Sequence, residues 1–322
     1  MKRKTQHVRF DELIPCRTAF IDTHNPGSEG KENFTIIGGG VSENPDQYVH
    51  IDETLGFNVG GAGQPAGSTN SLHSHRTAEI FVIHTGCWRF FWGLEGGDGE
   101  VVLHPGDLIT LPTHMFRGFE NITANSDTDS KGYGFMFSVL GGDDSGGGVV
   151  WAPQVLATAQ QHGLVLLVSG QLIDVANGES VPDDVVPLGP VSGAELAYYS
   201  RNTISDSNKV VARRPGSWMH TVTEVIGKNS GAVIRERPGF EVVRVHWDED
   251  ETVPWRLPMV DAALILNAGS AELSNGVRLG RGDVVLLHGG DEIVDVQPAN
   301  GARSELFVVI PTDDLPGETR LE

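Results

Sequence analysis

The chain has 322 residues, of which 39% are hydrophobic and 20% are charged, as is typical of a soluble globular protein. Its formal net charge of -20 at pH 7 would repel phosphate backbones and anionic lipid surfaces, which argues against nucleic acid and membranes as partners. The 41 glycines and 17 prolines separate short apolar segments rich in valine, isoleucine and phenylalanine, so an all-β barrel or sandwich is expected.

The sequence predicts a cytoplasmic protein. Residues 1–7 are basic, but no apolar segment follows them, so no signal peptide is expected. No apolar run approaches the length of a membrane-spanning helix. The two cysteines, Cys16 and Cys87, do not form a disulfide framework, in agreement with a reducing compartment.

Four segments are expected along the chain. Residues 1–50 form a turn-rich N-terminal arm, which either covers the mouth of the first β-rich block, residues 51–140, or exchanges onto a partner subunit. Residues 141–194 form a linker that is rich in glycine at its start and contains a short helix over 151–162. Residues 195–322 form a second β-rich block whose layout repeats that of the first, which indicates a duplicated domain.

Two histidines and a carboxylate stand at the head of an apolar, β-prone run in the first block. His73 and His75 are two residues apart, so in a strand their side chains point to the same face. Glu79 points to the same face if residues 76–78 continue the strand, so that its side chains keep alternating. Two imidazoles and one carboxylate that converge on one point form the ligand set of an open metal site. The chemistry of the protein is therefore expected here.

The spacing of these residues resembles the first sequence motif of the cupin superfamily of jelly-roll barrels. That motif is glycine, five residues, His-x-His, three or four residues, glutamate, six residues and glycine, and it is satisfied by Gly67, His73, His75, Glu79 and Gly86. The resemblance implies an all-β fold of two jelly-roll (double-stranded β-helix) cupin barrels joined by the short helical linker.

The second cupin motif is incomplete in this chain. Gly106, Pro112 and Asn121 match it, but its glycine position is occupied by His114 and its metal-binding histidine position by Arg117. Arginine stays protonated and cannot donate a lone pair to a metal.

Two ligand sets therefore remain open. Either His114 serves as the fourth ligand, or the site keeps three ligands and open positions, like the facial triad of non-haem Fe(II) oxygenases. The three-ligand set is favoured because the motif puts Arg117, rather than His114, on the inward position. Arg117 would then clamp an anionic oxygen of the substrate, or it pairs with a carboxylate such as Glu120. A cupin that has kept the pattern and lost the metal is a further alternative.

The second block resembles a cupin in its layout only. The positions that correspond to metal ligands are occupied by Arg256, Pro258, Ala262 and Ile293. The second barrel is therefore expected to be structural, packing against the first barrel or forming a dimer surface.

The resemblance implies a function closest to quercetinase-like and gentisate-like cupin dioxygenases. His73, His75 and Glu79 would hold one divalent metal, Fe(II) in this hypothesis, with Mn, Ni, Cu and Zn as alternatives. Phe81 and Ile83 share the parity of Glu79 and would line the pocket of a small anionic phenolic or enolisable substrate, with dioxygen as co-substrate. The alternatives are an oxygen-independent isomerase, lyase or decarboxylase, and a non-catalytic small-molecule-binding bicupin. A homodimer is the expected oligomer.

Overall fold

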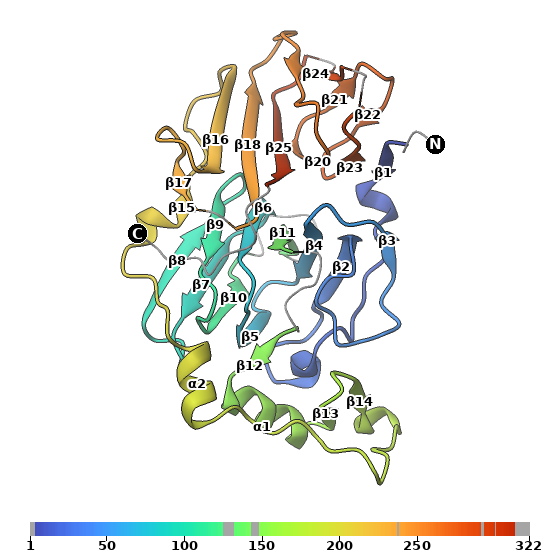
Figure 1. Ribbon diagram of the computed structural model, residues 1–322, viewed down its shortest axis with the longest axis vertical. Helices are drawn as coiled ribbons and strands as arrows, with labels where there is room; N and C mark the ends of the chain where they lie inside the picture. Colours follow the sequence, from blue (N-terminus) through green and yellow to red (C-terminus); the bar gives the residue numbers. More distant parts are fainter. Residues whose placement is uncertain are drawn as a thin grey trace.

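A computed structural model describes residues 4–124, 132–142, 148–236, 238–290, 293–299 and 301–312. These residues form two β-barrels, with the second barrel above the first in Figure 1 and a helical segment below both. The predicted all-β fold of two jelly-roll barrels joined by a short helical linker is confirmed.

The first barrel consists of a seven-stranded and a five-stranded sheet whose strands are mostly antiparallel. The larger sheet has the order β15 (Val211–Ala212), β9 (Leu108–Leu111), β6 (Glu79–Thr85), β11 (Gly134–Gly141), β4 (Phe57–Gln64), β2 (Glu32–Ile37) and β3 (Val49–Ile51). The smaller sheet has the order β12 (Val150–Trp151), β5 (Thr69–Ser74), β10 (Arg117–Asn121), β7 (Trp88–Trp92) and β8 (Gly99–Leu103). Burial alternates along β7, which places Trp88, Phe90 and Trp92 in the barrel core.

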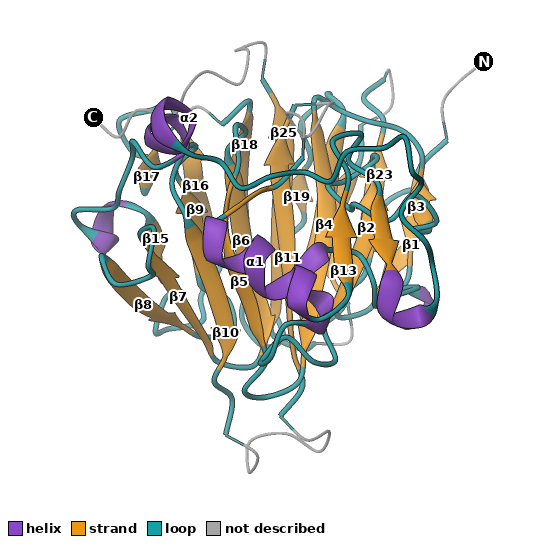
Figure 2. Cartoon of the chain, turned by 90° about the horizontal axis from the view of Figure 1, so that it is seen from below, coloured by secondary structure: helices purple, strands orange, loops and turns teal. Residues whose placement is uncertain are grey.

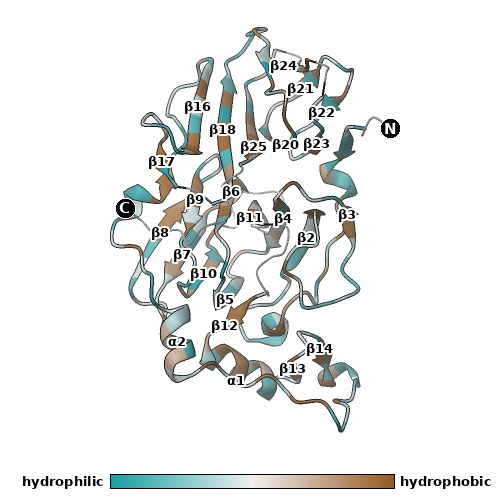
Figure 3. Cartoon of the chain, viewed as in Figure 1, coloured by the Kyte–Doolittle hydropathy of each residue, from teal (hydrophilic) through white to brown (hydrophobic). Residues whose placement is uncertain are grey.

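The second barrel has a seven-stranded and a four-stranded sheet. The larger sheet has the order β1 (Gln6–Val8), β23 (Val284–Leu287), β20 (Ala262–Ala268), β25 (Ser304–Pro311), β18 (Phe240–Trp247), β16 (Thr221–Gly227) and β17 (Ile234–Arg235). The smaller sheet has the order β19 (Trp255–Arg256), β24 (Asp295–Pro298), β21 (Ala271–Leu273) and β22 (Arg278–Leu279). Apolar side chains such as Val245, Leu264 and Leu306 pack together in its interior. Figure 3 shows apolar stretches along the strands of both barrels.

Each barrel completes its larger sheet with a short strand from the other half of the chain. β1, from the N-terminal arm, pairs with β23 of the second barrel, whereas β15, which follows the helical linker, pairs with β9 of the first. The first strand of the arm is thus paired within its own chain. One apolar cluster contains Val59 and Val139 of the first barrel together with Val242 and Phe307 of the second, so the larger sheets share a core.

A buried polar network also crosses between the barrels. Glu305 accepts a hydrogen bond from Asn267 at 2.7 Å, and its carboxylate lies 2.6 Å from His246 Nε2. The Asn267 side-chain oxygen lies 3.1 Å from His84 Nδ1 of the first barrel. Burial raises the pKa of Glu305, but its bond with His246 and two nearby arginines outweigh burial and leave this pKa below its usual value.

The helical segment covers one end of the first barrel, as the view from below in Figure 2 shows for α1. α1 (Pro153–Gln161) lies within the range predicted for a helix, begins at a proline, and is followed by Gly163 with a φ of 83°. Its buried face, which includes Leu156, packs against the arm. The remaining elements are β13 (Leu164–Leu166), β14 (Leu172–Asp174), α2 (Gly193–Tyr199) and the 3-10 turns η1 (Phe10–Glu12), η2 (Ile21–His24), η3 (Val175–Asn177) and η4 (Ser207–Lys209).

No helix in the described part of the chain is both long enough and apolar enough to cross a lipid bilayer.

Candidate metal centre

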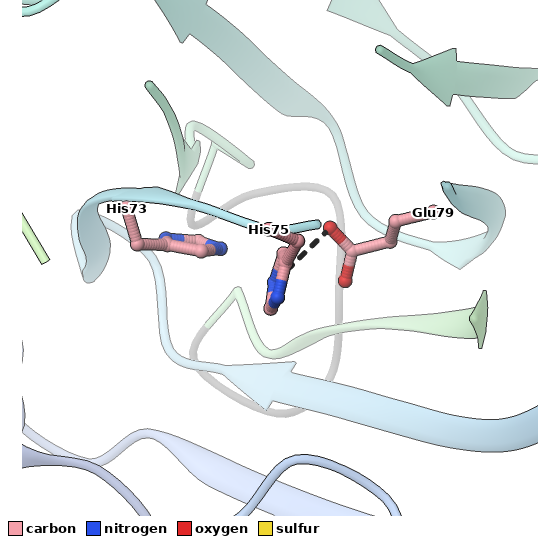
Figure 4. A group of neighbouring side chains, drawn as sticks. All are labelled: His73, His75 and Glu79. Atoms are coloured by element: carbon pink, nitrogen blue, oxygen red, sulfur yellow. Dashed lines mark ion pairs between the residues drawn. The ribbon is translucent and has the colours of Figure 1, made fainter. Parts of the chain in front are cut away.

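The chain turns from one sheet of the first barrel to the other between the two histidines and the glutamate. His73 lies on β5 in the five-stranded sheet, His75 follows the end of that strand, and Glu79 begins β6 in the seven-stranded sheet. The continuous strand assumed from the sequence is interrupted by a bend at residues 76–77. The three side chains nevertheless converge, because the two sheets face each other across the barrel interior (Figure 4).

The three side chains can offer one ligand atom each, and these atoms all lie within 4.8 Å of one another. His75 Nε2 lies 3.7 Å from Glu79 Oε2, and the rings of His73 and His75 are perpendicular, with centroids 5.0 Å apart. All three residues are buried. Across the described ranges, no other group of three or more histidine, cysteine or acidic side chains meets this criterion.

Hydrogen bonding and burial prepare the histidines to bind a metal. His73 Nδ1 lies 2.7 Å from the carbonyl oxygen of Ser71, which can only accept a hydrogen bond, so Nδ1 carries the proton and Nε2 keeps its lone pair. Burial, with the positive charge of Arg117, lowers the pKa of His73 to about 3 and that of His75 well below its usual value. Both imidazoles are therefore neutral near pH 7, the state that coordinates metals.

A buried ion pair from the N-terminal arm supports His73. Lys31 pairs with Asp22, and its ammonium also donates to Asn70 Oδ1 at 3.1 Å. Asp22 Oδ2 accepts from the backbone N–H of Ser71 at 3.0 Å. Asn70 and Ser71 are the two residues in contact with His73 Nδ1. Burial raises the pKa of Asp22, but the charge and hydrogen bond of Lys31 outweigh it, so this pKa lies below its usual value.

Arg117, the first residue of β10, pairs with Glu79. Its Nη2 donates to Glu79 Oε2 at 2.8 Å and its Nη1 donates to the carbonyl oxygen of Met115 at 3.2 Å. The guanidinium is fully buried. Glu120, the other candidate partner, accepts hydrogen bonds from Arg89 at 3.0 and 2.7 Å. Burial raises the pKa of Glu79 and Arg117 opposes this shift; the net pKa stays above its usual value.

His114 lies outside the group of three. Its backbone φ is 55°, in the left-handed region, which explains why the motif position is normally glycine. The ring contacts Tyr198 and Tyr199 of α2, with centroids 4.4 and 6.0 Å away, and its Nδ1 lies 3.3 Å from Arg201 Nη2. The structure thus places His114 against α2.

Solved structures with a similar fold include the bacterial pirin YhhW from Escherichia coli in complex with nickel(II), with a TM-score of 0.54, 11% identity and coverage of 96% of this chain and 100% of that one. Oxalate decarboxylase from Lactobacillus farciminis in its formate complex gives a TM-score of 0.56 at 11% identity, covering 98% of this chain and 88% of that one. Procruciferin, an 11S globulin from Brassica napus, gives 0.54 at 11% identity, covering 96% and 85%.

The chain has the two-barrel cupin fold. No protein-family model and no curated protein sequence matches this bicupin. At 11% identity the neighbours show the fold alone, and this fold is the one that the spacing of His73, His75 and Glu79 predicted.

The three side chains line a cavity of about 60 Å³ in the first barrel of the bicupin. A single water needs roughly 10–15 Å³ by this measure, so the cavity holds a ligand of several atoms. Phe81 and Phe119 form its apolar wall. They belong to the same apolar cluster as Ile83, which does not line the cavity. The arm contributes to the lining with Cys16, Ala19, Phe20, Thr23 and Lys31.

Glu43 ties the arm to the rim of this cavity. Its two carboxyl oxygens accept hydrogen bonds from Trp151 Nε1 at 2.6 Å and from the backbone N–H of Ile21 at 2.7 Å. The Trp151 ring lies 5.5 Å from the ring of His73. Burial raises the pKa of Glu43 to about 8. The carboxyl is therefore mostly protonated in the folded protein at pH 7.

Glu43 is expected to make the stability of the bicupin fall as the pH rises. From pH 4.5 to about 8 the carboxyl is ionised in the unfolded chain and protonated in the folded one, so each pH unit removes about 1.4 kcal/mol. Glu43→Gln cannot ionise and should flatten this slope, measured by urea unfolding across the range. The control, Glu95→Gln at an exposed glutamate, should keep the wild-type slope. An unchanged slope in Glu43→Gln would contradict the raised pKa.

Proposed function

We propose that this bicupin is a metal-dependent enzyme that acts on a small anionic organic molecule in its first barrel. The observation that carries the proposal is the convergence of His73, His75 and Glu79 on the wall of a cavity in the first barrel. Two neutral imidazoles and a carboxylate suit Fe(II), and they also suit Mn, Ni, Cu and Zn. When bound, such a metal supplies a Lewis acid and open coordination positions.

The charge balance of the site supports an anionic substrate. Arg117 compensates the negative charge of Glu79, and the burial of both histidines keeps them neutral. A divalent ion in this site would therefore bring two positive charges that no side chain of the group of three balances. Uncompensated charge is costly inside a protein, so a phenolate, enolate or carboxylate would bind favourably beside the metal.

We favour an Fe(II) dioxygenase whose substrate is phenolic or enolisable. A set of three protein ligands leaves room for both an organic substrate and dioxygen, and the phenylalanine wall suits an apolar carbon skeleton. Oxygen-independent decarboxylation or lyase chemistry is the second candidate. It is supported by the small volume of the cavity and by the fold shared with an oxalate decarboxylase whose structure contains formate.

Metal content tests the proposal directly. Wild-type protein reconstituted with Fe(II) or Zn(II) and desalted should retain one metal per chain, measured by elemental analysis. His73→Ala and His75→Ala should each lose most of this metal because every ligand contributes to an open three-ligand site. His104→Ala, which removes an exposed histidine of the same barrel, should keep it. Metal-free wild type, or unchanged content in His73→Ala, would overturn the proposed site.

Oxygen uptake separates the two reaction classes. Fe(II)-loaded protein is mixed with phenols, β-diketones and small dicarboxylic acids while dissolved oxygen and substrate are followed together. A dioxygenase consumes oxygen in step with substrate. Substrate loss without oxygen uptake would reject the dioxygenase and support the decarboxylase or lyase.

A further inference from the structure

A buried amide in the same cavity has no hydrogen-bond partner. Gln64 is the last residue of β4 and is 1% exposed, and neither its Oε1 nor its Nε2 forms a hydrogen bond. Its side chain lines the cavity that also contains His73, His75 and Glu79. An unpaired buried amide destabilises a folded protein, so its presence calls for a partner that binds there.

The backbone holds Gln64 in this position. Its carbonyl oxygen accepts a hydrogen bond from Asn121 Nδ2 at 2.7 Å, and the residue pairs with Gly134 in the sheet. The following Pro65 restricts it to an extended conformation. Ala62, two residues earlier on the same face of β4, also lines the cavity and has a small side chain that leaves space beside the amide. The backbone of Gln64 is thus fixed, and its side-chain amide has room for a ligand.

Gln64 and Glu79 lie toward opposite ends of the barrel. Along β11, Gln64 is level with Gly134 and Glu79 is level with Leu140. Phe81, which is level with Ser138 between them, contributes an apolar surface. The cavity therefore has an end with the candidate metal ligands, a middle that contains the Phe81 ring and an end with an unpaired amide.

We propose that Gln64 binds the end of the substrate that points away from the metal, and that this end carries an adjacent donor and acceptor, as a carboxamide does. The inference rests on the proposed function, because it takes the other end of the substrate to bind at His73, His75 and Glu79. A glutamine amide donates through Nε2 and accepts through Oε1. A carboxamide returns both hydrogen bonds, whereas a carboxylate only accepts and would leave Oε1 unpaired.

The first test needs no substrate. Gln64→Leu removes the unpaired amide, so the melting temperature of the metal-free protein should rise by about 2–4 °C. Asn121→Leu is the matched contrast, since this buried amide donates to Gln64 and Gly132 and should lower the melting temperature. A lower melting temperature for Gln64→Leu than for wild type would mean that the amide has a structural role, for example through a buried water, and would overturn the proposal.

The second test uses two catechols and the zinc-loaded protein. Protocatechuamide carries a carboxamide opposite its two hydroxyl groups, and in methylcatechol a methyl group replaces that carboxamide. Calorimetry should show that wild type binds the carboxamide at least about ten-fold more tightly and that Gln64→Leu loses this preference. Equal or absent binding of the two catechols by zinc-loaded wild type would overturn the role of Gln64. Failure of wild type to bind zinc would overturn the proposed function itself.

Discussion

Arg117→Met is expected to destabilise the metal-free protein by about 3–5 kcal/mol. Glu79 is 4% exposed and takes its hydrogen bond and its compensating charge from Arg117. Without that partner the carboxylate is left buried and uncompensated. Urea unfolding measures the loss. The double variant Arg117→Met/Glu79→Gln, which removes both charges, should recover most of the stability, since the penalty comes from the isolated charge.

Metal should compensate for the missing guanidinium. In Arg117→Met a divalent ion bound by His73, His75 and Glu79 supplies the positive charge that Glu79 has lost. Zinc at 100 times its dissociation constant should restore about 2.7 kcal/mol. Arg117→His places an imidazole at the fourth cupin ligand position and should tighten zinc binding by about ten-fold or more. Equal stability of Arg117→Met and wild type without metal would contradict the role given to this ion pair.

The sequence was sufficient to predict that the three candidate metal ligands converge, because the information that brings them together is local. His73, His75 and Glu79 lie within seven residues, and the flanking glycines fix the turns around them. The reason for their convergence was different from the one expected, since the chain crosses between sheets before Glu79. The three side chains still converge, because the two sheets face each other and bring together residues on either side of a short bend.

The alternation of side chains along β6 predicted which residues face the barrel interior, but not which of them line the cavity. Phe81 and Ile83 lie on the same face of β6, as expected, and six of the seven residues of this strand are buried. Residues on one face of a strand still differ in their level along the barrel, which alternation does not specify. Both side chains therefore belong to the apolar interior, and of the two Phe81 also lines the cavity.

The support of His73 by the arm was not predictable from the sequence. Asp22 and Lys31 lie in a turn-rich segment with no periodicity, and Ser71 is 49 residues from Asp22. Contacts at such separations depend on how the arm folds back over the barrel. Arg117 was recognised as unusual at its motif position, but its partner, Glu79, is itself a candidate ligand, so the motif alone did not indicate the pair.

Lys31→Met is expected to destabilise the protein by about 3–5 kcal/mol. It should also reverse the sign of the contribution that Asp22 makes to the pH dependence of folding stability. In wild type, Lys31 keeps the pKa of the fully buried Asp22 below its usual value, so this stabilisation is present above pH 3.8 and is lost as the pH falls through the lowered pKa. Without Lys31, the hydrogen bond from Ser71 remains as the main opposition to burial, and burial raises this pKa. The stability of Lys31→Met should then decrease as the pH rises above 3.8.

The same substitution should weaken the metal site by about ten-fold, because Lys31 orients Asn70 and Asp22 holds Ser71, the two contacts of His73 Nδ1. Zinc titration and urea unfolding at several pH values measure the two effects. Asp22→Asn/Lys31→Met separates them, since it removes the isolated charge without rebuilding the support of His73. Its stability should recover while its zinc affinity stays low. If the double variant recovers both its stability and its zinc affinity, the ion pair affects His73 only by stabilising the fold. If Lys31→Met keeps the wild-type zinc affinity, the arm does not orient this ligand.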